Sequence, residues 1–280
     1  MYYYTNSKRY HERGGRWMKD SEYLRSGQIS AEEKAFLENY DPDKYKKPSV
    51  TADVVTLTVD EQDQLCILLI KRGGYPYKGK WALPGGFMNT DEESVTQAAR
   101  RELFEETGVQ DVSLRQLYTF SQPGRDPRMH VVSVAYTALV PKGSLKVRAG
   151  DDAWEAEVFR ISYDVDGMTF QSDSALVREE DLAFDHAKII RMAIKRLRSR
   201  IKYEPDAFWL LKDKKEFAIS ELKVIYESIL NEKLDLANFR KAFLRDYVDA
   251  GRVCSLNKKS NSKRPAMLYS LTEELTEEEI

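Results

Sequence analysis

Cysteine is scarce in this sequence, and long apolar runs are missing. The 280 residues include two cysteines, Cys66 and Cys254, each in an apolar stretch typical of a strand. We therefore expect two core thiols in a reducing compartment rather than a disulfide framework. No apolar run approaches the roughly 20 residues that span a membrane, and the N-terminus lacks the apolar region of a signal peptide. These absences predict a cytoplasmic protein with no membrane partner.

Net charge is also nearly absent, at −2 from 44 basic and 46 acidic residues, so only local charge can indicate a partner. The length is typical of about two domains. Changes in composition predict an N-terminal extension, a first domain, a linker helix, a second domain and an acidic tail, over residues 1–48, 49–183, 184–204, 205–272 and 273–280.

The most informative stretch runs from Gly85 to Val109. Glycines at both of its ends indicate turns. Thr90 followed by Glu93 has the spacing of a capping box, which predicts a helix start. Nothing interrupts the helix from Val95 to Glu106, and Gly108 stands where a C-cap glycine belongs.

One face of this predicted helix changes from apolar to acidic. Glu102, Glu105 and Glu106 continue the face that begins with small apolar residues. Three carboxylates that close together repel one another, and a hard cation such as Mg²⁺ would remove the conflict. The alternative is a solvated charged face paired with Arg100 and Arg101.

The run from Arg101 to Val109 resembles the second half of the Nudix box without a mismatch, and seven residues separate Glu93 from Arg101, as in that family. The resemblance implies a hydrolase of nucleoside diphosphates linked to another moiety, dependent on Mg²⁺ or Mn²⁺. It assigns catalytic roles to Glu93, Arg101, Glu102, Glu105 and Glu106, and metal ligation to the Gly86 carbonyl and the last three glutamates.

The spacing departs from the family pattern at one point. The family leaves five residues between its leading glycine and the first glutamate, whereas six separate Gly86 from Glu93. Either the loop carries one extra residue, or Glu92 takes part of the role of Glu93. The departure bears on the position of the Gly86 carbonyl more than on the three glutamates.

Strands are predicted on both sides of this helix, over residues 50–59, 65–70, 114–121, 130–140 and 154–161. They do not alternate regularly with helices, which favours a mixed α/β sandwich over a doubly wound sheet. The resemblance likewise implies the Nudix α/β/α sandwich with a mixed sheet.

A proline- and glycine-rich loop, residues 122–128, carries Arg125, Asp126 and Arg128. Guanidinium groups bind phosphate or carboxylate in a two-pronged manner, although a plain surface turn is the alternative. The loop resembles that of Nudix proteins that bind ADP-ribose. We therefore expect these three residues, together with Arg72 at the end of the second strand, to contact an ADP-ribose-like nucleotide.

A long amphipathic helix is predicted from Asp185 to Lys202. Its apolar stripe consists of Ile190, Ile194, Leu197 and Ile201. The stripe and the cations around it fit a solvated face, a domain linker, a dimer seam or a surface that docks on the first domain. His186, at the start of the helix, is more typical of a hydrogen-bonded structural histidine than of a ligand.

The last domain has the order helix, helix, strand, basic loop, strand, which is that of a winged helix. Ser220 and Asp235 are its predicted helix caps. Residues 217–272 hold ten Lys or Arg against six Asp or Glu. The expected contacts with double-stranded DNA lie on the second helix and the wing: Asn238, Arg240, Lys241, Arg245, Lys258, Lys259, Lys263 and Arg264. A dimerisation domain with a charged face is the alternative.

Residues 41–272 together resemble the Nudix-related transcriptional regulators, which sense ADP-ribose or related sugars and control NAD-linked or pentose genes. Two functions follow. One is hydrolysis of ADP-ribose to AMP and ribose 5-phosphate, and the other is ligand-responsive repression by a homodimer on DNA. A Nudix enzyme whose C-terminal domain only dimerises is the third possibility.

Overall fold

The computed structural model describes residues 29–272, except 42, 91, 111, 146, 148–152, 166 and 261–264. Most of the predicted N-terminal extension, the acidic tail, and the candidate DNA contacts Lys263 and Arg264 therefore lie outside the described residues. Within the described part, no helix is long and apolar enough to cross a membrane.

The chain divides into two compact units, of which the smaller comprises Met1–Pro48 and Thr90–Glu92. Its described helix, α2 (Ala31–Asn39), begins after Ser30, whose hydroxyl caps it by accepting a hydrogen bond from the Glu33 N–H at 3.1 Å. No side chain of α2 is buried.

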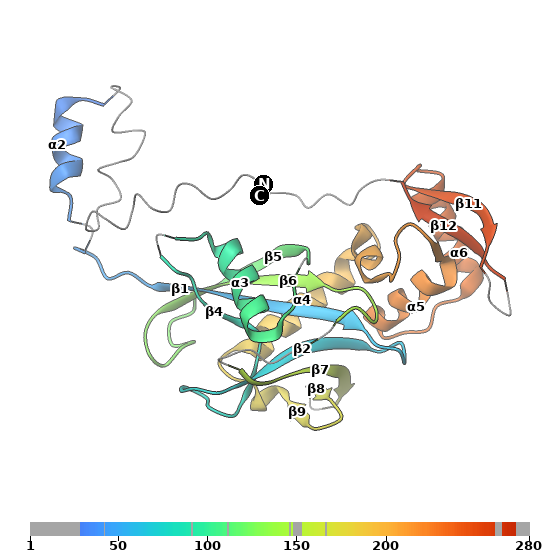
Figure 1. Cartoon of the computed structure of the whole chain (residues 1–280), viewed down its shortest axis with the longest axis horizontal. Coiled ribbons are helices and arrows are strands. Elements are labelled where there is room, and N and C mark those ends of the chain that lie inside the picture. The colour runs from blue at the N-terminus through green and yellow to red at the C-terminus, as the bar shows by residue number, and fades with distance from the viewer. Residues whose placement is uncertain are drawn as a thin grey trace. The chain divides into compact units, whose positions relative to one another are not determined.

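The larger unit is built on a nine-stranded mixed sheet (Figure 1). Its strands are β1 (Ser49–Val59), β2 (Leu65–Arg72), β3 (Trp81–Ala82), β4 (Gly85–Phe87), β5 (Leu114–Phe120), β6 (Val131–Leu139), β7 (Ala153–Asp164), β8 (Gly167–Gln171) and β9 (Leu176–Arg178). The order is β5-β6-β1-β2-β7-β8-β9, with β3 beside β2 and β4 beside β1. β1 is parallel to β6 and antiparallel to β2.

Helices cover both faces of this sheet (Figure 1). Ala52 and Val54 of β1 pack with α3 (Val95–Thr107), whereas Val55 and Leu57 belong to the cluster that contains α4 (His186–Arg200). Because successive residues of a strand face opposite sides, β1 is buried on both faces and forms the middle layer of an α/β/α sandwich.

The start of α3 differs from the prediction. The N-cap is Ser94, whose hydroxyl accepts the Gln97 N–H, while the Gln97 side chain accepts the Ser94 N–H at 2.7 Å. The capping box predicted at Thr90 and Glu93 is therefore wrong, because the Glu93 carboxylate is bound elsewhere. The predicted end is confirmed: Gly108 adopts φ 72° and donates to the Phe104 carbonyl.

The apolar stripe of α4 is buried, with Ile190, Ile194, Leu197 and Ile201 at most 4% exposed. They pack in one cluster with sheet residues such as Leu57. The alternative of a docking surface for the first domain is confirmed. A stripe already covered within one chain cannot serve as a dimer seam.

The second predicted domain contains η4 (Pro205–Leu210), β10 (Phe217–Ala218), α5 (Ile219–Leu230), α6 (Leu236–Phe243), the π-helical turn η5 (Leu244–Val248), β11 (Val253–Lys259) and β12 (Met267–Leu271). Its sheet has the order β10-β12-β11. Asp235 caps α6 as predicted, accepting the Asn238 N–H at 2.8 Å.

Two smaller predictions for this part of the chain are wrong. Ser220 lies inside α5, whose N-cap is Ala218, and the Ala218 N–H donates to Glu221. Cys254 is exposed, because it alternates with inward-facing residues on β11, whereas Cys66 is a buried core thiol as expected.

One hydrophobic cluster runs from the large sheet through α4 and η4 into α5 and β12. Apolar side chains of both predicted domains therefore exclude water together, and we expect the two to unfold cooperatively.

Replacing Leu222 of α5, which is fully buried, with Ala should lower the free energy of unfolding by about 2–4 kcal/mol through the cavity it leaves. Calorimetry should show one transition that shifts as a whole. Leu236→Ala is the matched control, because Leu236 is 55% exposed and its loss should cost less than about 1 kcal/mol. Two transitions, of which only one moved, would show that the domains unfold independently.

Candidate functional site

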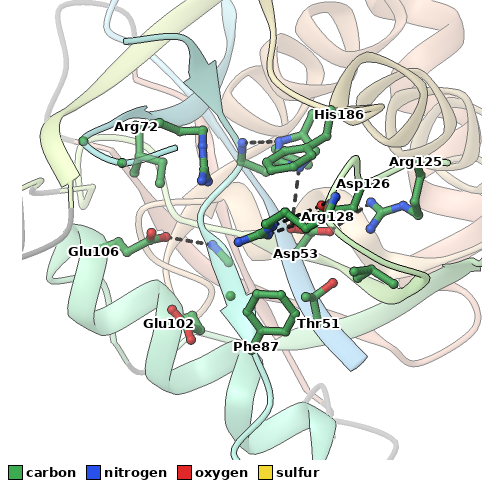
Figure 2. Close-up of a pocket in the computed structure, with 18 of the residues that line it drawn as sticks. Thr51, Asp53, Arg72, Phe87, Glu102, Glu106, Arg125, Asp126, Arg128 and His186 are labelled. Atoms are coloured by element: carbon green, nitrogen blue, oxygen red, sulfur yellow. Dashed lines mark hydrogen bonds and ion pairs between the residues drawn. The ribbon is translucent and has the colours of Figure 1, made fainter. Parts of the chain in front are cut away.

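A cavity of about 510 Å³ opens over the first half of β1 and the C-terminal half of α3 (Figure 2). It is lined by β1, β2, β4, α3, the loop of residues 122–130 and the start of α4. Its volume is in the range of small-molecule sites. All four residues predicted to bind the nucleotide line it: Arg72, Arg125, Asp126 and Arg128.

Arg101 organises the acidic end of this site. Its guanidinium contacts the carboxylates of Glu93 at 2.7 Å, Glu102 at 2.8 Å and Glu105 at 2.9 Å, and donates to the Phe87 carbonyl at 3.0 Å. The hydrogen bonds from Arg101 lower the pKa of Glu93. Because Glu93 itself pairs with Arg101, the loop after Gly86 accommodates the extra residue.

The three glutamates of the predicted acidic face do not share one environment. Glu102 and Glu106 line the cavity, whereas the Glu105 side chain is 55% exposed and turns to Arg101. Burial raises the pKa of Glu106 to about 8, although its carboxylate accepts the Gly85 N–H at 2.7 Å. Burial also raises the pKa of Glu102, against the opposing effect of Arg101.

The residues present fit a divalent cation in part. Glu102 and Glu106 are carboxylates removed from water, which a cation would stabilise. A Cβ at Gly86 would stand against Glu102 Oε1, so a larger residue at this position would displace the Glu102 carboxylate. Among the described residues, however, no three acidic, histidine or cysteine side chains converge as a metal site. Glu105 would have to break its ion pair with Arg101 to supply the third side chain of a metal site.

Two guanidinium groups face the same cavity, each against an aromatic ring. Arg72 lies 4.9 Å from the centre of the Phe184 ring, and Arg128 lies 5.0 Å from that of Phe87. Arg128 also binds Asp126 at 2.8 Å. Burial, followed by the charge of Arg128, lowers the pKa of Arg72. An anion between the two cations would relieve this repulsion.

Arg125 is held differently, in a buried network around Asp53 (Figure 2). Its side chain, 5% exposed, contacts Asp185 at 2.8 Å and Asp53 at 3.5 Å. The Ser133 hydroxyl donates to the same Asp53 carboxylate. Both aspartates therefore already neutralise Arg125, and its first role is to hold the loop of residues 122–130.

His186 completes this network. Its Nδ1 accepts the Leu83 N–H at 2.9 Å, and its Nε2 lies 3.7 Å from Asp53. Burial lowers the pKa of His186, so the ring is neutral with its proton on Nε2. The prediction of a hydrogen-bonded structural histidine is confirmed. Asp53 is not among the predicted site residues, although an acidic residue inside an otherwise apolar strand is a signal that could have identified it.

The described candidate DNA contacts are all exposed on the winged-helix domain: Asn238, Arg240, Lys241, Arg245, Lys258 and Lys259. Two of them have acidic partners. Arg245 binds Asp246 at 2.6 Å, and Lys258 pairs with Glu216. A DNA phosphate would have to replace these carboxylates.

Comparisons with known proteins agree with this architecture. The NUDIX domain model matches residues 47–169, and the NrtR DNA-binding winged helix domain model matches residues 207–271. The chain thus joins a Nudix domain to a winged helix, and the predicted fold class is confirmed.

Individual relatives extend the match over most of the chain. The ADPR responsive transcriptional repressor NtrR of Acinetobacter baylyi is 35% identical over 85% of this chain and 87% of its own length. The ADP-ribose pyrophosphatase of Methanocaldococcus jannaschii is 42% identical over 52% of this chain and 73% of its own length. A MutT/nudix family protein from Enterococcus faecalis superposes with a TM-score of 0.71 and 31% identity, covering 92% of this chain and 100% of that one. The chain belongs to the NrtR family of Nudix-related transcriptional regulators.

The raised pKa of Glu106 makes stability depend on pH. The folded protein keeps a proton on Glu106 up to a pH of about 8, whereas the unfolded chain loses it near 4.5. The free energy of unfolding should therefore fall between these two pH values, by no more than about 5 kcal/mol. Chemical denaturation across this range should show a smaller decrease for Glu106→Gln, which keeps the size but cannot titrate. Parallel curves for the two proteins would contradict the assignment.

Proposed function

We propose that this chain binds ADP-ribose in the 510 Å³ cavity and responds to it as a DNA-binding regulator. The observation that carries the proposal is the pair of aromatic-backed guanidiniums, Arg72 and Arg128, facing one cavity. Guanidinium forks match the oxygens of a diphosphate, and aromatic rings support bases and sugars by stacking. The likeness to an ADPR responsive repressor supports the same ligand.

The regulator half of the proposal rests on the exposed face of α6 and the wing. Asn238, Arg240 and Lys241 project from α6, and Lys258 and Lys259 from β11, without being covered by the chain. A helix in the major groove can read bases while wing cations bind phosphates. A homodimer would supply two such modules to double-stranded DNA and raise the effective affinity.

Hydrolysis of ADP-ribose to AMP and ribose 5-phosphate is a second candidate. Nudix hydrolases use divalent metal ions, and here Glu102, Glu106 and the Gly86 carbonyl would hold Mg²⁺ or Mn²⁺. The metal would polarise the diphosphate and activate water. Glu93 and Arg101 would fix the helix that carries these ligands. The engagement of Glu105 by Arg101 favours binding over turnover.

Arg128→Lys should weaken ADP-ribose binding by about tenfold, because lysine keeps the charge beside Asp126 but loses the two-pronged geometry. Isothermal titration measures this directly. The matched control is Arg191→Lys, an exposed arginine that pairs with Glu179 outside the cavity and should bind as the wild type does. If both variants bound ADP-ribose with equal affinity, Arg128 would not contribute to ligand binding.

The hydrolysis candidate is tested by adding Mg²⁺ to ADP-ribose and the wild-type protein and measuring AMP. Release of AMP by the wild type, and its loss in Glu106→Gln, would support hydrolysis.

Glu216→Gln should strengthen DNA binding, because it frees Lys258, whereas a Lys258→Ala, Lys259→Ala double variant should weaken it for every sequence. Fluorescence anisotropy over a salt series should show a shallower salt dependence for the double variant, by about two units of slope. Arg240→Ala should instead relax sequence preference. If the protein bound no duplex DNA at low salt, the proposal that it is a DNA-binding regulator would be wrong.

A further inference from the structure

Helix α4 begins in the wall of the cavity. Asp185, its N-cap, pairs with Arg125 at 2.8 Å, and His186 accepts the Leu83 N–H at 2.9 Å. Phe184, directly before them, lies under the Arg72 guanidinium. A ligand that contacts Arg72 or displaces the Arg125 loop therefore acts on the first turn of α4.

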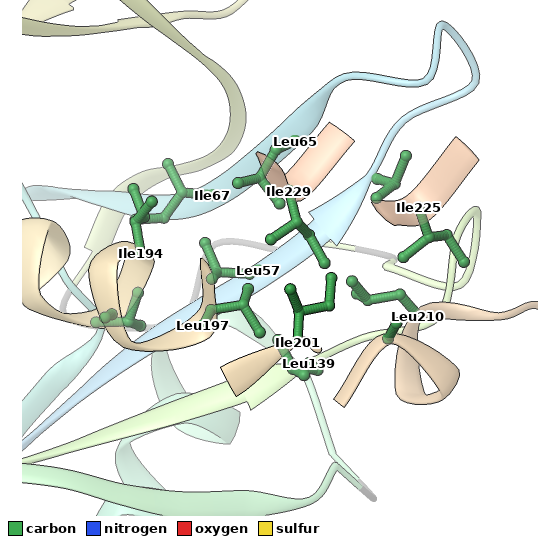
Figure 3. Packing of buried hydrophobic residues seen from close by; sticks show 14 of the residues in the cluster. Leu57, Leu65, Ile67, Leu139, Ile194, Leu197, Ile201, Leu210, Ile225 and Ile229 are labelled. Atoms are coloured by element: carbon green, nitrogen blue, oxygen red, sulfur yellow. The ribbon is translucent and has the colours of Figure 1, made fainter. Parts of the chain in front are cut away.

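The opposite end of α4 contacts the winged-helix domain. Arg198 donates from Nε to the Ile229 carbonyl in the last turn of α5, at 2.7 Å. Beside this bond, Leu197 and Ile201 gather with Ile225 and Ile229 in one apolar cluster (Figure 3). A helix rises about 1.5 Å per residue, so α4 spans roughly 18 Å between His186 and Arg198 as a single stiff element.

The surroundings of Arg198 are not closely packed. The residue lines two cavities, of about 200 Å³ and 380 Å³, and its guanidinium lies 4.5 Å from the centre of the Tyr163 ring. Its Nη2 is buried and has no hydrogen-bond partner among the described residues. A buried donor without a partner is costly, and the adjoining space leaves room for a second arrangement. The junction can therefore change where a filled core could not.

The winged-helix domain also touches the large sheet independently of α4. Ser228, next to Ile229 on α5, donates from its hydroxyl to the Asp63 carbonyl in the β1–β2 turn at 2.6 Å. This contact fixes the same end of α5 but does not touch the element that begins at the cavity. It provides a matched comparison for Arg198.

We infer that Arg198 is the positioning residue through which α4 transmits occupation of the cavity to the winged helix. The inference rests on the proposed function, since it needs both ADP-ribose and DNA as ligands. A ligand shifts a protein between two arrangements only as far as its affinity for them differs. Ligand contacts with the first turn of α4 change the position of Arg198, and the Arg198–Ile229 bond moves α5 with it.

The test measures DNA affinity with and without saturating ADP-ribose in the full chain. The ratio of the two affinities in the wild type should be about 5–150-fold, as is typical of allosteric coupling. Arg198→Met keeps the aliphatic stem but loses the Nε donor. In this variant, the DNA affinities with and without ADP-ribose should differ by no more than about twofold. Ser228→Ala should keep the wild-type ratio. By reciprocity, DNA should change ADP-ribose affinity by the same factor in each protein.

If Arg198 only stabilised the fold, replacing it would change the DNA affinities with and without ADP-ribose by the same factor, and their ratio would stay the same. A change in the ratio therefore indicates coupling. Arg198→Lys, which keeps the cation over Tyr163, replaces Arg198→Met if the latter does not fold, and should show the same loss of the ratio. The inference would be overturned if a folded Arg198 variant kept the wild-type ratio of DNA affinities. It would also be overturned if Ser228→Ala lost this ratio to the same extent. A wild type that binds both ligands with equal DNA affinity in the two conditions would overturn the inference and the proposed response to ADP-ribose, but would leave the proposed binding of each ligand intact. Failure of the wild type to bind either ligand would overturn the proposed function together with the inference.

Discussion

A carboxylate buried in the middle of the sheet imposes the main constraint on this structure. Asp53 lies on β1, which is covered on both faces, and a buried charge without partners would cost several kcal/mol. Arg125, Ser133 and His186 satisfy it from three other segments of the chain. The loop of residues 122–130, strand β6 and the start of α4 must therefore meet at β1, and the cavity forms where they meet.

The acidic helix shows how one set of residues can serve either stability or catalysis. Arg101 contacts Glu93, Glu102 and Glu105, and its positive charge reduces the repulsion between the neighbouring carboxylates without a metal ion. The same pairing keeps Glu105 away from the cavity, where only Glu102 and Glu106 remain. A Nudix domain arranged in this way keeps a cavity of about 510 Å³ lined by Arg72 and Arg128, so the proposed binding of ADP-ribose does not require its turnover.

Local pattern predicted much of this architecture, and contacts between distant residues account for what it missed. Periodicity identified α3, α4 and the two winged-helix helices, and the family motif singled out Glu93 and Arg101, which form an ion pair in the structure. The Asp53–Arg125 and Asp53–Ser133 contacts join residues 72 and 80 positions apart, beyond any local signal. The two-residue strand β3 exists because β2 lies beside it. The side toward which Glu105 turns depends on competition for Arg101, which a helical projection cannot decide.

The proposed response to ADP-ribose depends on the continuous core that joins the cavity to the winged-helix domain through α4. Hydrogen exchange followed by mass spectrometry, with and without ADP-ribose, tests this directly because it reports on each segment separately. We expect ADP-ribose to change exchange in peptides from the start of α4, through Arg198, and into α5 around Ile229. Changes confined to the cavity-lining peptides, with α5 exchanging identically in both states, would contradict it.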